Sequence, residues 1–428
     1  LAPTNKACDV LCKKILETDG NSLEWVGRFV ATSDEEIEEI GAVFDRLSTI
    51  YQKDKCCVIS TIARLPFDGF KNDLGTNELK NLEWDYVIFD EASMIPLAQI
   101  VYPLYKFNSN FIISGDPFQI EPIVSEPLWE DENIYKMVNL NSFKSPKTEP
   151  HDYNVCPLDT QYRSIPALGR LFSEYSYDGL LKHHRESDSQ VKVKIDGLTL
   201  KPINYYFFDV NKYEGCFAVK KLSTSNVHVY SVIYILEYCN YLAKHIEIEG
   251  DSIFKIGIIC PYTAQAQLIE NLINQVVVLP LNIEIHVGTI HCFQGDQCNM
   301  IITVFNPPKK ADDTTFKSLI NKKNIINVAV SRAEDYLCVF MPHPDTYIFN
   351  QLHELKALTY IANLSPDDVS MNTCNDLEPV ICGENNYIVN NTFVTSHQLA
   401  NVYTKPDFHY EVRIDEKAAD IQINKDWT

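Results

Sequence analysis

Carboxylates follow two short apolar runs in the first third of the chain. Residues 86–89 lead into Asp90 and Glu91, and residues 110–114 lead into Gly115-Asp116-Pro117-Phe118-Gln119. The length and the β-branched and aromatic content of both runs predict buried parallel strands. Ligands of open α/β sheets bind beyond the carboxyl ends of the strands, so we expect one shared site there. Asp90 could hold Mg²⁺, Glu91 could orient or deprotonate a water, and Gln119 could position that water or contact a terminal phosphate.

A strand that ends in Asp-Glu is, by itself, more often a solvated edge than a site. The neighbouring Gly-Asp-x-x-Gln segment is the feature that favours a site. Strand and helix patterns alternate four times before about residue 125, which predicts a mostly parallel sheet around these strands.

Three further segments of the first third supply the rest of this sheet. Residues 1–7 predict a strand end that opens into a helix, and residues 58–61 predict a strand end with hydroxyl groups at its carboxyl edge. Thr4 and Asn5 lie at the expected helix N-terminus, which suits phosphates, although either could serve simply as an N-cap. Residues 34–51 predict one amphipathic helix, whose apolar stripe is Ile37, Ile40, Phe44 and Leu47.

The second half repeats the alternation and ends near residue 364. Strand patterns cover residues 205–210, 256–262, 284–289, 300–305 and 337–341, and helix patterns cover 229–243 and 264–275. Tyr162 and Arg163 are adjacent near its start, and Arg332 lies at an expected strand-to-helix turn. A single arginine is usually a surface residue. Two at such positions suggest a charged face that could stabilise a transferring phosphoryl group.

Composition limits the class of protein. The formal charge is −21, from 37 basic and 58 acidic residues, which argues against coating nucleic acid with the whole surface but allows a local groove. Thirteen scattered cysteines without a Cys-x-x-Cys pair favour reduced thiols and a cytoplasmic location, or a nuclear one in a eukaryote. No apolar run reaches membrane-spanning length. Because the chain begins at Leu1, we expect the natural N-terminus to lie upstream.

Seven segments resemble, in order, the motifs of superfamily 1 helicases. The resemblance is greatest to the group that includes the nonsense-mediated-decay helicase and its DNA-acting relatives. It spans residues 1 to about 364, and the ordered set is far more specific than any single motif. The segments are Ala2-Pro3-Thr4-Asn5, Ser60-Thr61, Asp90-Glu91-Ala92-Ser93, Gly115-Asp116-Pro117-Phe118-Gln119, Gln161-Tyr162-Arg163, Thr289 with Phe293-Gln294-Gly295, and Asn327-Val328-Ala329-Val330-Ser331-Arg332-Ala333.

The resemblance implies an α/β fold with two RecA-like parallel-sheet domains, ATP between them and single-stranded DNA or RNA across both. It implies that Asp90 holds Mg²⁺, Glu91 is the catalytic base and Gln119 senses the γ-phosphate. Tyr162 would pack on the adenine, Gly295 would lie in the nucleotide-binding loop, and Arg163 and Arg332 would be arginine fingers. The nucleic-acid backbone would contact Thr4, Asn5, Thr61 and Thr289.

The expected domains are a first RecA-like domain (1–141), a linker (142–156), a second RecA-like domain (157–364) and an acidic appendage (365–428). The appendage, a small β-rich or partly disordered module, could bind a protein partner. The family's Gly-x-x-x-x-Gly-Lys-Ser/Thr phosphate loop is absent, since no Gly in the chain is followed by Lys. We therefore expect a fragment whose first domain is incomplete and which is inactive alone.

Two other departures concern the loop after Thr289. Gln297 stands where the family has a glutamate that holds the ribose, and His291 stands where near relatives have aspartate. The leading hypothesis is an ATP-driven helicase or translocase of 5′→3′ polarity. The alternatives are a non-catalytic helicase-like binding module and, less favoured, a metal-dependent nuclease that uses Asp90, Glu91 and Asp116.

Overall fold

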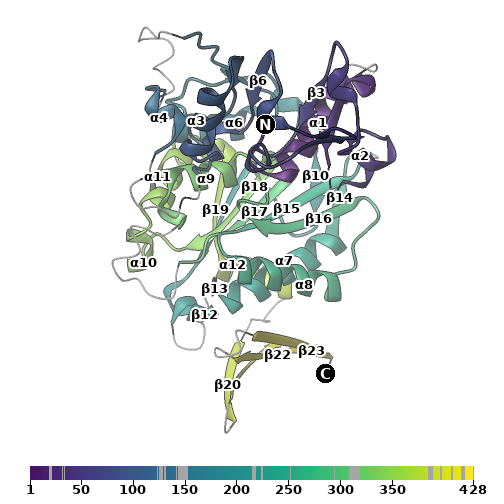
Figure 1. The fold of residues 1–428 in the computed structure, drawn as a ribbon. Coiled ribbons are helices and arrows are strands. Elements are labelled where there is room, and N and C mark those ends of the chain that lie inside the picture. The colour runs from purple at the N-terminus through teal and green to yellow at the C-terminus, as the bar shows by residue number, and fades with distance from the viewer. Residues whose placement is uncertain are drawn as a thin grey trace. The chain divides into compact units, whose positions relative to one another are not determined.

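The computed structural model (Figure 1) describes residues 1–18, 22–30, 32, 34–122, 124, 129, 132–140, 142, 153–214, 218–222, 225–250, 252–293, 295–307 and 319–383, and four strands within 389–427. The chain forms two compact units, Leu1–Val155 and Cys156–Thr428. The division falls within the expected linker, of which residues 143–152 lie outside the described residues.

Parallel strands form the first unit. β1 (Val26–Phe29) pairs in parallel with β2 (Val43–Phe44) and β3 (Cys57–Ile59), and β6 (Tyr86–Phe89) pairs in parallel with β7 (Asn110–Ile113). Leu1 and Ala2 link the two groups, because Ala2 forms a parallel bridge with Thr61 and Asp90 N donates to Leu1 O at 2.8 Å. The expected parallel sheet is confirmed.

The other elements of the first unit are short except for two helices. α1 (Asn5–Thr18) and α3 (Leu97–Lys106) are the longer helices, while α2 (Glu35–Glu39) and α4 (Ile134–Met137) are brief. β4 (Gly69–Asn72) and β5 (Gly75–Glu78) form an antiparallel hairpin that the sequence analysis did not anticipate.

The single helix expected over residues 34–51 is wrong. The segment forms α2, then the strand β2, then a 3₁₀ turn at Ile50–Gln52. Gly41 has φ +71°, a left-handed conformation that ends helices, and Phe44 pairs with Phe29 in the sheet. Of the expected stripe Ile37 and Phe44 are buried, whereas Ile40 and Leu47 are 44% and 72% exposed.

A six-stranded parallel sheet forms the centre of the second unit. Its order is β16 (Ile283–Thr289), β15 (Phe254–Cys260), β17 (Cys298–Val304), β18 (Ala333–Pro342), β11 (Ile203–Phe208) and β19 (Val369–Thr373). Every neighbouring pair is parallel. The expected strands of this half are confirmed, and they are nearly continuous apolar runs, as in a sheet covered on both faces.

Helices cover both faces of this sheet (Figure 1). α7 (Val229–His245), α8 (Thr263–Val276) and α12 (Cys374–Cys382) pack in one core with alternate strand residues such as Tyr206, Ile258 and Phe340. On the other side lie α6 (Pro166–Ser176), α9 (Lys323–Val330) and α11 (His353–Ala362). There Thr359 of α11 donates to Met341 Sδ at 3.9 Å.

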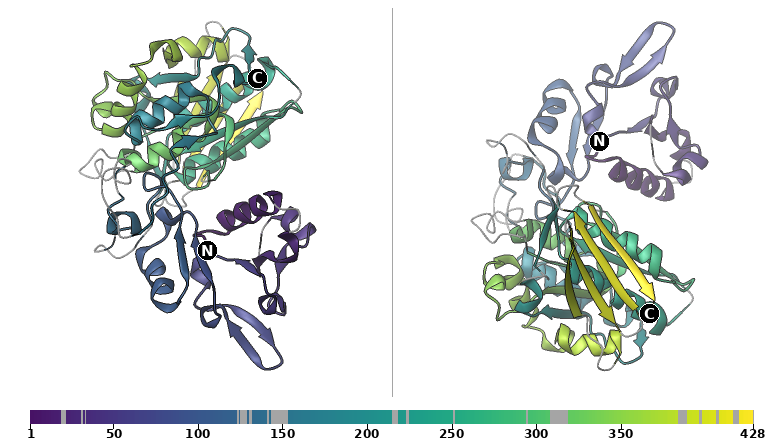
Figure 2. Two further views of the ribbon diagram at one scale, coloured as in Figure 1. Left: turned by 90° about the horizontal axis from the view of Figure 1, so that it is seen from above. Right: turned by 90° about the horizontal axis from the view of Figure 1, so that it is seen from below.

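The sheet extends beyond the end expected near residue 364. β19 pairs with β11, and α12 packs on α7, so these two elements belong to this unit and not to the expected appendage. Only afterwards does a separate antiparallel sheet follow, as expected of a β-rich module (Figure 2). Its strands are β20 (Val389–Thr395), β21 (Gln398–Lys405), β22 (Phe408–Asp415) and β23 (Asp420–Trp427).

Short elements complete the second unit. They are α10 (Tyr347–Asn350) and the strand pairs β8 (Thr160–Gln161) with β9 (Lys182–His183), β10 (Val193–Ile195) with β14 (Ile246–Ile248), and β12 (Lys220–Leu222) with β13 (Ser225–Val227). Within the described part of the chain, no helix has both the length and the apolar character needed to cross a membrane.

Candidate nucleotide site and arginine loops

The first unit brings the expected carboxylates to one edge. β6 and β7 run in register, with Phe89 opposite Ile113. The ladder continues past the strand ends, because Ser114 N donates to Phe89 O at 2.8 Å. Asp90 and Glu91 therefore leave the sheet at the same level as Gly115 and Asp116, and the shared edge that the sequence predicted is present.

The backbone at this edge is unusual. Glu91 has φ +50° and ψ +42°, a left-handed conformation that is uncommon outside glycine and that clusters at functional sites. Gly115 has φ +154°, and a Cβ there would lie 2.8 Å from Ala92 N and 2.7 Å from the Tyr135 hydroxyl. Only glycine fits this close approach between the two strand ends.

Asp116 organises the turn that carries Gln119. Its Oδ1 accepts from Phe118 N at 2.9 Å, and its Oδ2 accepts from Gln119 Nε2 at 3.0 Å. The side chain of Gln119 is therefore oriented by Asp116. Asp116 itself has a role in holding the turn, which weakens the hypothesis that it is a nuclease metal ligand.

The hydroxyl of Tyr135 of α4 lies beside Gly115, at the edge that carries the carboxylates. The residue is 6% exposed, and its hydroxyl has no hydrogen-bond partner among the described residues. Burial raises its pKa, and the carboxylates of Asp116, Glu91 and Asp90 raise it further. This edge is therefore negative, as a site for a divalent cation requires.

Ala2 places Thr4 and Thr61 close to the β6–β7 sheet. Ala2 bridges Thr61, and α1 begins directly after Thr4. Thr4 Oγ1 accepts from Ala7 N at 3.1 Å, so this side chain caps the helix, the alternative that the sequence left open. Thr61 is 8% exposed, which leaves little side-chain surface for a ligand.

Asn5 is held by a residue that the sequence analysis missed. Arg28 of β1 is fully buried, and its Nη2 donates to Asn5 Oδ1 at 2.9 Å. Arg28 Nη1 also donates to Ile59 O at 3.2 Å, and Nε donates to Asp9 Oδ1 at 2.7 Å. The side-chain oxygen of Asn5 is thus engaged in a hydrogen bond within the fold, and Arg28 links α1 to β3.

In the second unit, Gln161 builds the loop that presents Tyr162 and Arg163. Ser164 N donates to Gln161 Oε1, and Gln161 Nε2 donates back to Ser164 O, both at 2.8 Å. Tyr162 is 65% exposed, and its ring centroid lies 4.4 Å from that of His184. The loop leaves this aromatic pair available for stacking with a base.

Arg163 connects three segments that are far apart in sequence. Its Nη1 donates to Ser331 O at 2.8 Å, and its Nε donates to Gln297 Oε1 at 3.2 Å. Gln297 is the residue that replaces the family's glutamate, and here it is a neutral partner of Arg163. A glutamate in the same place would form an ion pair with the guanidinium.

Arg332 lies at a helix-to-strand turn, so the strand-to-helix turn expected there is wrong. α9 ends at Val330 and β18 begins at Ala333. Residues 325–330 are all buried, and periodicity alone cannot distinguish a fully buried helix from a strand. Arg332 is 2% exposed, and its Nε donates to Val328 O at 3.2 Å.

Thr289 is the last residue of β16, and Gly295 lies in the loop that follows it. Thr289 O accepts from Cys292 N at 3.0 Å and from Phe293 N at 3.3 Å, which closes the first turn of the loop. Burial lowers the pKa of His291, which favours the neutral imidazole. Gly295 has φ +85°, in the region that favours glycine, whereas Gln294 lies outside the described residues.

These observations can be compared with known proteins. A family model described as an AAA domain matches residues 141–342. The DNA replication ATP-dependent helicase/nuclease JHS1 of Arabidopsis thaliana is 26% identical over 381 residues, which cover 86% of this chain and 27% of that protein. Helicase SEN1 of Saccharomyces cerevisiae is 28% identical over 264 residues, which cover 60% of this chain and 11% of that protein.

These matches support the assignment of the chain to the superfamily 1 helicases. The chain spans only about a quarter of the length of JHS1 and about a tenth of SEN1. Among solved structures, one titled the structure of PRRSV helicase aligns with 94% of this chain and 53% of its own, at 12% identity and a TM-score of 0.37. That similarity is too low to carry weight, and the α/β assignment rests on the parallel sheets.

The helicase motifs therefore form two groups, one in each unit. Asp90, Glu91 and Gln119 gather at the β6–β7 edge. Arg163 and Arg332 lie on two segments that hydrogen bonds join, with Tyr162 exposed beside Arg163. Sequence analysis missed the residues that hold these groups in place, because their partners are distant in the chain. The Gly-Asp-x-x-Gln spacing was a local signal for the turn at Asp116, whereas no local signal marks Arg28.

The β6–β7 edge suits a Mg²⁺ ion bound together with nucleotide phosphates. Mg²⁺ in nucleotide sites takes one or two carboxylates together with phosphate oxygens and waters, and Asp90 supplies one carboxylate. No group of three or more His, Cys, Asp or Glu side chains able to hold a metal occurs in the part of the chain that is described. Members of this helicase family use nucleotides, so a phosphate-assisted site is the appropriate comparison.

Proposed function

We propose that this chain carries the two RecA-like units of an ATP-driven helicase or translocase that moves 5′→3′ along single-stranded nucleic acid. The single observation that supports this most strongly is the β6–β7 edge. There two in-register strands deliver Asp90-Glu91 and the Gly115–Gln119 turn side by side, with Glu91 in a left-handed conformation. Catalysis of phosphoryl transfer is mostly positioning and charge stabilisation. This edge supplies the Asp90 carboxylate for a metal ion, the Glu91 carboxylate as a base and the Gln119 amide.

Within this proposal each side chain has one role. Asp90 would hold the Mg²⁺ of Mg-ATP, Glu91 would take the proton of the attacking water, and Gln119 would orient that water. Bound Mg²⁺ supplies charge neutralisation for the phosphates. Gln119 suits its role because Asp116 already fixes its amide nitrogen.

For the second unit we propose roles in binding the nucleotide and in stabilising the transition state. Tyr162 would stack on the adenine, which its exposure permits. Arg163 and Arg332 would stabilise charge on the transferring phosphoryl group, and the loop containing Gly295 would lie near the nucleotide. Gln297 Oε1 accepts from Arg163 Nε at 3.2 Å, so this amide helps to orient the guanidinium.

Single-stranded nucleic acid would contact Thr4, Asn5, Thr61 and Thr289 mainly through backbone groups. The side-chain oxygens of Thr4 and Asn5 already accept hydrogen bonds within the fold, and Thr61 is buried. Backbone contacts of this kind position a strand without reading its sequence.

We further propose that residues 1–428 alone do not turn over ATP. The chain has no Gly-Lys pair and thus no phosphate loop. Among the described residues β7 pairs only with β6, and Tyr86, Ile88 and Ile112 of these strands are 61%, 45% and 47% exposed. A strand added beside β7 would pair with its free edge, and the loop that cradles the phosphates could follow that strand.

Phosphate release by the full-length protein, with Mg-ATP and a single-stranded oligonucleotide, tests the proposal. We expect stimulated turnover that Glu91→Gln lowers by roughly 10²-fold or more, because the general base is lost. The matched control is Glu83→Gln, an exposed glutamate of the same unit, which should leave turnover unchanged. No turnover by the parent protein would favour the non-catalytic binding module. Glu91-dependent turnover by residues 1–428 alone would refute the proposal about the phosphate loop.

A further inference from the structure

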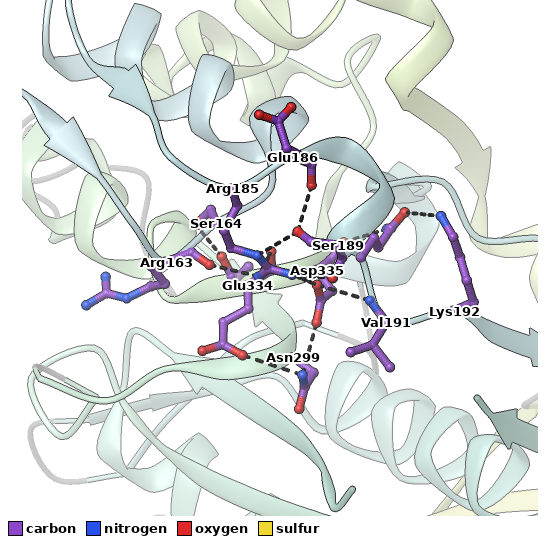
Figure 3. Close-up of polar contacts among 12 residues, drawn as sticks. Arg163, Ser164, Arg185, Glu186, Ser189, Val191, Lys192, Asn299, Glu334 and Asp335 are labelled. Atoms are coloured by element: carbon purple, nitrogen blue, oxygen red, sulfur yellow. Dashed lines mark hydrogen bonds and ion pairs between the residues drawn. The ribbon is translucent and has the colours of Figure 1, made fainter. Parts of the chain in front are cut away.

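Arg185 lies where the two segments that carry Arg163 and Arg332 meet (Figure 3). It follows β9, and its side chain is 19% exposed. Its Nη1 donates to Arg163 O at 2.8 Å and to Glu334 O at 3.3 Å. One guanidinium nitrogen thus joins the peptide that follows Arg163 to the peptide that follows Glu334.

The rest of the Arg185 guanidinium is also engaged. Nη2 donates to Asp335 Oδ1 at 2.8 Å and to Ser189 O at 2.8 Å, and Nε donates to Ser189 Oγ at 3.1 Å. Five hydrogen bonds from three nitrogens fix the plane of the guanidinium. A lysine ammonium at the same place could not reproduce this fork.

Asp335 is the buried partner of Arg185 in an ion pair. Its side chain is 1% exposed, so its charge requires a close partner. Asp335 Oδ2 accepts from Asn299 Nδ2 at 3.0 Å, and Asn299 Oδ1 accepts from Lys255 N at 3.0 Å. A chain of hydrogen bonds therefore runs from Lys255 of β15 through Asn299 and Asp335 to Arg185, and Figure 3 shows its part from Asn299 to Arg185.

Further hydrogen bonds join the same two segments, residues 163–165 and residues 331–335. Ser164 Oγ donates to Ala333 O at 2.6 Å, and Ile165 N donates to Glu334 O at 3.0 Å. The Arg163 side chain donates to Ser331 O, and the Arg163 carbonyl accepts from Arg185. The contact between these two segments therefore holds both the side chain and the backbone of Arg163. A shift in the peptide of Arg163 would move the base of its side chain.

We propose that Arg185 is a positioning residue that sets the direction of the Arg163 side chain for ATP hydrolysis, with Asp335 as its anchor. The inference rests on the proposed function, in which Arg163 stabilises the transferring phosphoryl group. Misplacement of a catalytic group by about 1 Å can cost on the order of 10²-fold in rate. Arg185 does not need to touch the nucleotide to have such an effect.

The test is a double-mutant cycle in the full-length protein, read as ATP turnover with a single-stranded oligonucleotide. We expect Arg185→Lys to lower kcat by about 10²-fold with nucleotide KM changed by less than about 3-fold. In an Arg163→Ala background the same substitution should lower kcat by less than about 3-fold, because the group that it positions is gone. Asp335→Asn should behave like Arg185→Lys.

The control is Arg170→Lys, at an arginine of α6 that is 51% exposed and pairs with Asp368 at 2.7 Å. It should leave kcat unchanged. A purely structural role for Arg185 would reduce kcat by equal factors in both backgrounds and would overturn the inference, as would a rate for Arg185→Lys within about 3-fold of the parent. A parent without ATP turnover would instead refute the proposed function, and this inference with it.

Discussion

Glu334 is a carboxylate that the fold holds in an unfavourable place. It is half-buried next to Asp335, and burial and then the Asp335 charge raise its pKa, while Arg185, Arg163 and Lys255 act in the opposite direction. The folded protein therefore binds the Glu334 proton more tightly than the unfolded chain does. The charged form costs stability at pH values above the folded-state pKa, and this cost disappears below the unfolded-state pKa.

We accordingly predict that Glu334→Gln raises the melting temperature at pH 8. The gain should shrink as the pH falls toward the ordinary pKa of glutamate, about 4.3, because the parent residue then becomes neutral too. Thermal unfolding of parent and variant between pH 5 and pH 8 measures this. Glu186→Gln, at an exposed residue of the same unit, should show no such trend. A gain that grew toward pH 5 would contradict the prediction.

At the scale of elements, Arg28 is a buried cation that joins a helix to two strands. It lies on β1, pairs with Asp9 of α1 and donates to Ile59 O of β3. The side chains of Arg28 and Asp9 are 0% and 6% exposed, so neither charge can be hydrated if the other is removed. The position of Asn5, at the start of α1, depends on the same arginine.

Arg28→Met should lower the unfolding free energy of the first unit by about 3–5 kcal/mol, the usual cost of leaving one member of a buried pair alone. Chemical denaturation followed by the fluorescence of Trp25 and Trp84 would report on this unit. The control is Lys14→Met, which removes an exposed ion pair with Glu17 at 2.7 Å. Exposed pairs contribute about 0–1 kcal/mol, so the control should change little. Equal effects of the two substitutions would show that the Arg28 pair is not structural.

The whole molecule is acidic, and this governs its binding to nucleic acid. With a formal charge of −21, long-range attraction to phosphates is absent, and affinity must come from a few local contacts. The expected contacts at Thr4, Asn5, Thr61 and Thr289 are on strand ends and helix starts, and salt sensitivity requires basic side chains in a local groove beside them. Such contacts to the backbone position a strand without reading its sequence.

We predict weak, sequence-independent binding to single strands that salt weakens further, with little affinity for blunt duplex. Fluorescence anisotropy with a labelled oligonucleotide over a salt series is the measurement, and a blunt duplex of the same sequence is the control. Tight binding to one duplex sequence that did not respond to salt would contradict both this prediction and the assignment of the contacts.

The sequence by itself determined the α/β class, most strands of both sheets and the residues at their carboxyl ends, because apolar runs and the polar residues that follow them are local signals. It failed at residues 34–51 and 325–330, where a left-handed glycine and burial on all sides override periodicity. It also ended the second sheet too early, since β19 pairs with β11 across more than 160 residues. Only the tertiary structure identified Arg28 and Arg185 as residues that hold the candidate sites. Hydrogen bonds of a buried arginine join groups far apart in the chain, and spacing in sequence carries no record of them.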